Sequence, residues 1–254
     1  PLRKAKANLL DWAADCAAVA QHVRAQAPQL PLYWLGHSVG AQLPGINGSD
    51  MPIDGMLAIA SGSGYWRDNA TPTRRKVLLW WHVIAPVVTA VCGCLPGKKL
   101  GLVGNLPAGV LWQWRRWCLH PNYGIGVEGE ALRKAYAAAR YPVHAFSVED
   151  DEMMSWRSTA SLVGWYRNSA QRIERLRMLD VPGRRIGHFG FFRSEMEHTL
   201  WPRALAVLER WNLGEVTPKG QPSASNGATV MGMERRAMAA SRQCGQGELF
   251  SENP

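Results

Sequence analysis

Short apolar runs recur along the chain, separated by longer segments in which apolar residues are spaced three or four apart. The runs at 30–35, 54–60, 141–148 and 173–179 have the length and composition of buried strands. The helical spacing is found at 2–27, 158–169 and 195–213. Strands that alternate with helices are typical of a parallel sheet covered on both faces. The pattern therefore predicts an α/β fold with a mainly parallel sheet and helices on both sides.

The first helical segment, 2–27, places apolar side chains at alternating spacings of three and four residues before Pro28 ends it. This spacing predicts that the buried face carries Leu9, Trp12, Cys16, Val19 and Val23.

The first of these apolar runs, 30–35, leads directly into Gly36-His37-Ser38-Val39-Gly40, and the helix-compatible residues 41–43 follow. A G-x-S-x-G sequence between a strand and a helix is typical of a nucleophile elbow. Glycine is expected at both ends of the motif because neighbouring backbone leaves no room for a Cβ. Ser38 is therefore the candidate nucleophile, and the Val39 amide is a candidate oxyanion donor. His37 is expected on the other side of the strand, in packing or substrate contact.

A serine hydroxyl is a weak nucleophile, so the elbow needs a base and an orienting acid elsewhere in the chain. His188 lies in a glycine-flanked segment, 185–192, that follows a predicted strand. Four carboxylates, Glu149 to Glu152, follow the strand at 141–148. The order of serine, acid and histidine is that of α/β-hydrolases.

Alternatives remain at each of these positions. His198 is a second candidate base, although its segment has the pattern of an amphipathic helix. His188 is equally compatible with a buried structural histidine. The acidic run is also compatible with a solvated turn that caps the next helix.

Together these motifs resemble the α/β-hydrolase superfamily, in particular a poorly characterised bacterial branch that is also similar at Ser61–Arg67 and Gly187–Arg193. The resemblance covers about residues 1–213 and implies Ser38 as nucleophile, Asp151 as acid and His188 as base, with no cofactor and no metal. Such hydrolases usually have a G-x-x-D turn at the acid, and Asp151 fits the end of that turn better than Asp150. Because Ser147 or Val148 stands where the glycine is expected, Asp150 remains an alternative.

Only 37 residues precede Ser38, whereas the resemblance implies several strands and an oxyanion loop before the elbow. We therefore expect 30–35 to form an exposed sheet edge and one oxyanion amide to be missing. The chain on its own is then expected to be poorly soluble or nearly inactive.

Residues 65–130 hold six of the twelve tryptophans and are interpreted as a helical insertion that forms a lid. Within this insertion, Val77–Val91 is apolar but shorter than a usual membrane span, and His82 and Pro86 interrupt it. A lid, a membrane-surface element and a span are all open interpretations. Trp112 is a candidate for lining an apolar substrate pocket, although tryptophans at such spacing also pack helices together.

The formal net charge is +9, but the basic residues are scattered and no nucleic-acid-binding motif accompanies them. We expect no nucleic-acid partner, whereas anionic lipid headgroups remain compatible. Five cysteines without a paired framework, and no secretory leader, indicate a cytoplasmic protein. The oligomeric state is left open.

These observations divide the chain into a first part of the core at 1–64, the insertion at 65–130, a second part of the core at 131–214 and a disordered tail at 215–254. The tail contains Gln246–Phe250, which resembles a short peptide that docks on the DNA sliding clamp, a pattern easily met by chance.

The sequence predicts a serine hydrolase that acts on an ester or related acyl substrate through an acyl-enzyme intermediate. The competing hypothesis is a non-catalytic fragment or pseudoenzyme that binds lipid or a partner through the Trp-rich insertion.

Overall fold

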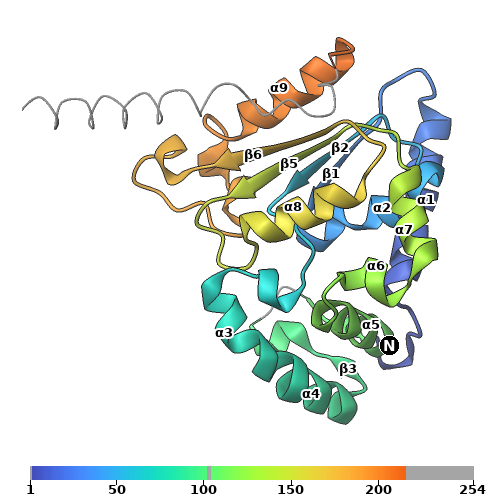
Figure 1. Ribbon diagram of the computed structural model, residues 1–254, viewed down its shortest axis with the longest axis vertical. Coiled ribbons are helices and arrows are strands. Elements are labelled where there is room, and N and C mark those ends of the chain that lie inside the picture. Colours follow the sequence, from blue (N-terminus) through green and yellow to red (C-terminus); the bar gives the residue numbers. More distant parts are fainter. Residues whose placement is uncertain (1, 102–103, 216–254) are drawn as a thin grey trace, which may run out of the picture. The chain divides into compact units, whose positions relative to one another are not determined.

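The computed structural model describes residues 2–101 and 104–215. Its centre is a parallel four-stranded sheet with the strand order β1-β2-β5-β6 (Figure 1). The strands are β1 (Tyr33–His37), β2 (Gly55–Ile59), β5 (Val143–Val148) and β6 (Gln171–Leu176). The predicted parallel sheet is confirmed.

The two inner strands are buried along their whole length, β2 at all five positions and β5 at all six. Such continuous burial requires cover on both faces of the sheet. In contrast, β1 pairs only with β2 in the described part of the chain, and its Leu35 is 46% exposed. The strand that leads to Ser38 is therefore an edge strand here, as expected from the sequence.

Helices cover the two faces of the sheet in different numbers (Figure 1). On one face, Met56, Ala58, Val143 and Ala145 join a large core with the helices α1, α2, α7 and α8. On the other face, Leu57, Ile59 and Phe146 pack with α9 and the loop before it. The bounds are α1 (Leu9–Gln26), α2 (Leu43–Asn47), α7 (Glu130–Ala138), α8 (Trp156–Trp165) and α9 (Trp201–Asn212).

The buried face of helix α1 agrees only in part with the one predicted, because Leu9 is buried and Trp12 packs against the core but the other buried positions differ. Its interior positions are Leu9, Ala13, Ala17 and Ala20, whereas Val19 and Val23 are exposed. Small side chains let α2 approach closely enough for the Asn47 amide to donate to the Ala13 carbonyl oxygen at 2.7 Å. The spacing of large apolar residues did not predict this face, because alanine is only weakly hydrophobic and a row of alanines gives a weak pattern.

The insertion is helical, with one short antiparallel hairpin. It contains α3 (Thr71–Leu79), a π-helical turn (Trp80–Ile84), α4 (Ala85–Cys92), the strands β3 (Cys94–Leu95) and β4 (Leu106–Pro107), α5 (Ala108–Leu119) and α6 (Tyr123–Val127). Its buried residues, among them Trp81, Leu111 and Trp117, belong to the same core cluster as Leu9 and Met56. The insertion thus shares the core of the sheet. By length and composition, the continuous stretch Thr71–Cys92 is one helix that could cross a membrane.

The C-terminal helix starts later than predicted, at Trp201 instead of 195. Residues 194–200 form a 3₁₀ turn and further turns, in which Met196 and Leu200 are buried. Pro202, in the first turn, favours a helix start at this point. The predicted tail lies almost wholly outside the described residues, and Gln246–Phe250 lies entirely outside them.

Candidate active site

Ser38 follows β1 in a left-handed backbone conformation, with φ +53°. This conformation is strained for a side-chain-bearing residue and turns the chain sharply into the 3₁₀ turn Ser38–Ala41. The Ser61 hydroxyl, at the end of the neighbouring strand, donates to the Ser38 carbonyl oxygen at 2.6 Å and supports the turn.

The expected need for glycine holds at only one end of the motif. A Cβ added at Gly36 would lie 2.5 Å from the Ala41 Cα, closer than atoms can pack. At Gly40 an added Cβ meets nothing within 4 Å. The tightness of the turn therefore rests on position 36.

His188 lies between Ser38 and Asp151. Its Nε2 is 3.0 Å from the Ser38 Oγ, and its Nδ1 is 2.9 Å and 3.1 Å from the two Asp151 carboxylate oxygens. His188 is 1% exposed and Asp151 is 5% exposed. Because a carboxylate can only accept hydrogen bonds, Asp151 holds the imidazole proton on Nδ1. Nε2 is then free to accept a hydrogen bond from the Ser38 hydroxyl.

The other candidate base lies elsewhere. His198 is exposed within the turn at 197–200, and among the described residues the imidazole that contacts both Ser38 Oγ and Asp151 is that of His188. His188 follows Gly187, whose φ of +61° lets the loop turn sharply before the imidazole.

No protein-family model and no curated protein sequence matches the chain. Among solved structures, a soluble variant of monoglyceride lipase from Saccharomyces cerevisiae, in complex with a substrate analogue, aligns with a TM-score of 0.51 and 14% identity over 82% of this chain and 69% of that one. The chain has the α/β-hydrolase fold. Two further similar structures are one of the metagenome-derived lipolytic enzymes LipS and LipT, and the esterase domain of a Rhodothermus marinus protein. The first has a TM-score of 0.48 and 16% identity, over 80% of this chain and 74% of that one. The second has a TM-score of 0.45 and 12% identity, over 81% of this chain and 69% of that one.

Within this α/β-hydrolase fold, the neighbouring carboxylates after β5 have different partners. Asp150 accepts from the backbone N–H groups of Ile186 at 3.1 Å and Gly187 at 2.9 Å. Glu152 accepts from the backbone N–H of His188 at 3.2 Å. Only Asp151 contacts the imidazole, and its Oδ1 also accepts from the N–H groups of Met153 and Met154. Asp150 and Glu152 thus hold the histidine loop by its backbone, whereas Asp151 holds the ring.

His37 also contacts the histidine loop. Its Nε2 donates to the His188 carbonyl oxygen at 2.8 Å, and its ring lies 4.8 Å from the His188 ring and 5.3 Å from those of Phe189 and Phe192. Burial lowers the pKa of His37, although the hydrogen bond to His188 raises it. The imidazole is therefore largely neutral at pH 7 and positions the loop.

Trp112 lies half-buried on α5, and two other tryptophans of that helix are fixed by hydrogen bonds. Trp117 donates to Glu128 at 2.7 Å, and Trp114 donates to the Tyr123 hydroxyl at 2.9 Å. Tyr123 in turn donates to the side-chain oxygen of Gln42 at 3.0 Å. These two tryptophans serve packing within the insertion and link it to the residue that follows the elbow turn.

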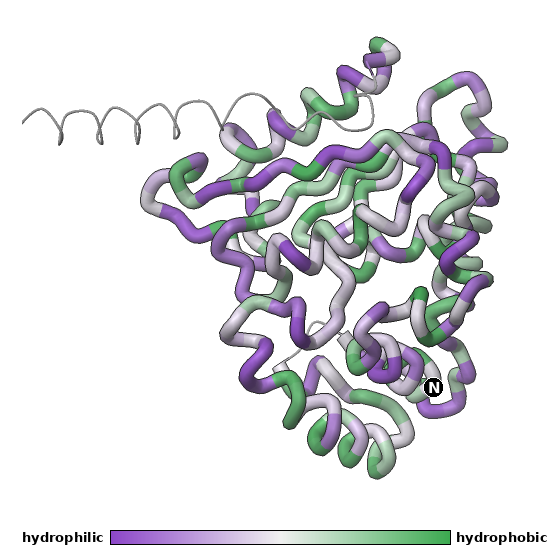
Figure 2. The backbone as a smooth tube through the Cα atoms, viewed as in Figure 1, coloured by the Kyte–Doolittle hydropathy of each residue, from purple (hydrophilic) through white to green (hydrophobic). Residues whose placement is uncertain are grey.

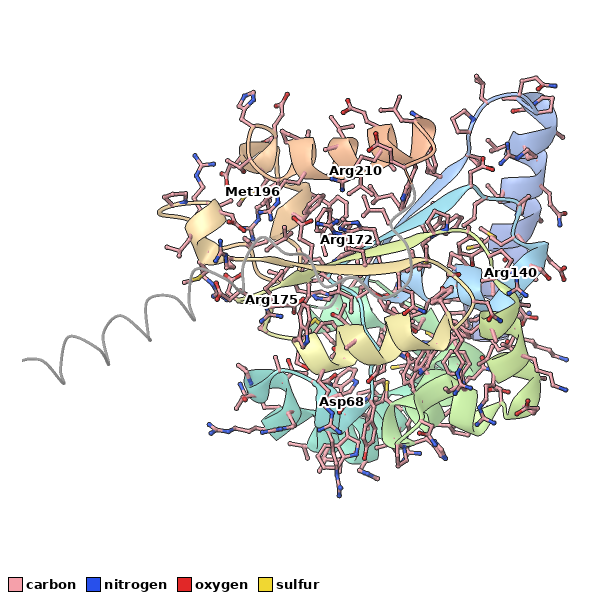
Figure 3. The ribbon with its side chains drawn as sticks, turned by 45° about the horizontal axis from the view of Figure 1, so that its top comes forward. Asp68, Arg140, Arg172, Arg175, Met196 and Arg210 are labelled. Carbon is pink, nitrogen blue, oxygen red and sulfur yellow. The ribbon has the colours of Figure 1, made fainter. Side chains whose placement is uncertain are left out.

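The start of the insertion is attached to the loop that carries Asp151. The Thr73 hydroxyl donates to the Glu152 carbonyl oxygen at 2.6 Å, and the Ala70 N–H donates to the Met153 carbonyl oxygen at 3.0 Å. Asp68, labelled in Figure 3, pairs with Arg157 of α8 at 2.9 Å. Helix α3 therefore begins beside the acid.

Sequence reasoning did not find the supporting residues Ser61, Thr73, Glu152 and Gln42. Each acts through a contact with a distant segment, and only Ser61 and Glu152 stood in motifs that the sequence had marked. Within residues 2–101 and 104–215, no group of three His, Cys, Asp or Glu side chains is placed to hold a metal ion.

Proposed function

We propose that the protein is a serine hydrolase that cleaves carboxylic esters through an acyl-enzyme intermediate. The observation that carries this proposal is the hydrogen-bonded series from Asp151 through His188 to Ser38, at 2.9 Å and 3.0 Å. The strained elbow adds support because it exposes a serine at the carboxyl end of a parallel strand.

In the proposed reaction, the Ser38 Oγ attacks the carbonyl carbon of the ester and its proton passes to Nε2 of His188. The carbonyl oxygen becomes an oxyanion, which the Val39 N–H stabilises. As the intermediate collapses, the C–O bond to the leaving alcohol breaks and His188 returns the proton to that oxygen. Water then attacks the acyl-enzyme by the same route and releases the acid.

Asp151 keeps its charge throughout and stabilises the transient imidazolium. Its two backbone N–H partners hold the carboxylate in place, so the acid does not have to reorganise when the imidazole becomes charged.

The apolar insertion favours an ester with a hydrophobic acyl part, and Trp112 is the proposed contact on it. Trp112→Ala is then expected to raise KM for longer acyl chains more than for acetyl esters. Equal changes for both substrates would contradict this role of Trp112.

The test is hydrolysis of p-nitrophenyl butyrate by the chain and by three variants. Ser38→Ala and His188→Gln are expected to reduce kcat on the order of 10⁴ or more, with an unchanged circular dichroism spectrum. The matched control is Ser49→Ala, because Ser49 is exposed in the 3₁₀ turn Gly48–Asp50 that follows α2. Full activity in Ser38→Ala would contradict the proposal and would favour the alternative, a non-catalytic binding protein.

A further inference from the structure

The helical stretch Thr71–Cys92 has two apolar faces in different surroundings. One face carries Val77, Trp81, Ala85 and Thr89, which are spaced by four residues and buried against the protein. The other face carries Leu79, Val83, Val87 and Val91, also spaced by four. These are 58%, 49%, 57% and 79% exposed, and we call them the exposed stripe.

Apolar side chains beside the exposed stripe widen it. Leu78 and Ile84 are 37% and 38% exposed. Leu100, in the 3₁₀ turn Gly97–Leu100 between β3 and β4, is 43% exposed. Figure 2 shows the strongly hydrophobic positions of α4 at the end of the molecule away from the sheet. Soluble surfaces rarely leave so many aliphatic side chains together without a partner.

The charged residues of the segment that carries the exposed stripe have one sign. From Asn69 to Val127 the sequence contains seven lysines and arginines and no aspartate or glutamate. Arg74, Arg75 and Lys76 are exposed in α3, and Lys98 and Lys99 are exposed beside Leu100. None of these five forms an ion pair within the described part of the chain. An apolar stripe flanked by unpaired basic side chains is complementary to an anionic membrane surface.

The buried face argues against a helix that crosses the membrane. Trp81 is 4% exposed, and its carbonyl oxygen accepts from the Arg115 Nε of α5 at 2.5 Å. The Thr73 hydroxyl is bonded to the acid loop. A span would need lipid around most of the helix, whereas here the face with Val77, Trp81 and Ala85 is buried against the protein.

We propose that the exposed stripe docks in the plane of an anionic lipid bilayer, with Arg74, Arg75, Lys76, Lys98 and Lys99 at the headgroups. The aliphatic side chains enter the boundary between headgroups and acyl chains, as in interfacial helices. This inference does not depend on catalysis, since it concerns a surface outside the hydrogen-bonded series at Ser38.

The test is cosedimentation of the whole chain with vesicles of phosphatidylcholine alone or with phosphatidylglycerol added. We expect binding to the mixed vesicles, which weakens as salt is raised, and little binding to phosphatidylcholine alone. Val83→Asp combined with Val87→Asp is expected to lower vesicle affinity at least tenfold. The matched control is Val19→Asp with Val23→Asp, two exposed apolar positions on α1, and it is expected to bind like the unmodified chain.

A second variant distinguishes the loss of positive charge from a loss of folding. Arg74→Gln with Arg75→Gln leaves the apolar stripe intact and is expected to weaken binding about fivefold per lost charge at low salt. The proposal is overturned if the unmodified chain stays in the supernatant or if Val83→Asp/Val87→Asp binds equally well. It is also overturned if the chain resists carbonate extraction from membranes, which indicates a span. A concentration-dependent dimer that the aspartates abolish would assign the stripe to a second copy.

Discussion

The imidazole of His37 donates to the backbone carbonyl oxygen of His188 at 2.8 Å, so the residue before the serine holds the loop of the proposed base. His37→Phe keeps an aromatic ring against Phe189 and Phe192 but removes this hydrogen bond. We expect kcat for p-nitrophenyl butyrate to fall about fivefold, the effect of one hydrogen bond, with KM nearly unchanged.

The matched control for this prediction is His198→Gln, because His198 is exposed and outside the site. An unchanged kcat in His37→Phe would show that the loop is held without His37, and an increase in KM alone would make His37 a substrate contact.

The two adjacent aspartates are expected to respond differently to removal of their charge. Asp151→Asn should lower kcat on the order of 10⁴, because the amide no longer fixes the proton on Nδ1 of His188. Asp150→Asn should lower the melting temperature and reduce kcat far less, because Asp150 holds the backbone of Ile186 and Gly187. Steady-state kinetics and thermal melts of both variants check this. The reverse ranking of kcat would transfer the orienting role to Asp150.

The elbow glycines provide a matched pair for stability. Gly36→Ala places a Cβ 2.5 Å from backbone of Ala41 and is expected to cost about 3 kcal/mol or to prevent folding. Gly40→Ala meets nothing within 4 Å and is expected to change the free energy of unfolding by less than about 1 kcal/mol. Urea unfolding measures both, and similar costs would mean that the turn is less tight at position 36 than described.

A half-buried charge cluster between β6 and α9 predicts acid sensitivity. Burial raises the pKa of Glu174, but the His144 imidazole at 3.5 Å and the ion pair with Arg203 at 2.5 Å outweigh it and hold that pKa at about 2. Since the folded pKa is lower than the unfolded one, the stabilisation is complete above about pH 4.5 and is lost as the pH falls toward 2.

Glu174→Gln is therefore expected to be about 2 kcal/mol less stable at pH 7, with a difference that shrinks as the pH approaches 2. Thermal melts between pH 7 and pH 2.5 measure this, with Glu197→Gln as an exposed control. A difference that stays constant over this range would exclude the ion pair as its cause.

Local patterns in the sequence were enough to predict the parallel sheet and to select Ser38 and His188 as candidates, whereas the preference for Asp151 over Asp150 came from the resemblance to α/β-hydrolases. The strand before Ser38 and the glycine-flanked loop of His188 are local features. In contrast, Asp150 and Asp151 are adjacent in the chain, and the sequence does not show which of them faces His188. The turn after β5 directs Asp150 to the backbone N–H of Gly187 and Asp151 to the His188 ring.

The buried face of α1 and the role of Thr73 were not predictable for a related reason. Alanines at 13, 17 and 20 are buried because α2 approaches closely, and that approach is a property of the packed fold. Thr73 contacts a carbonyl oxygen 79 residues away, which no local spacing indicates.

The most direct test of the proposed Ser38 nucleophile is mass-spectrometric mapping of the adduct formed with a fluorophosphonate. Only a serine activated by a neighbouring base reacts at a useful rate. We expect one adduct per chain, on Ser38, formed slowly if a single oxyanion donor serves the site and lost in His188→Gln. No adduct on the unmodified chain, or an adduct on a different serine, would contradict the account.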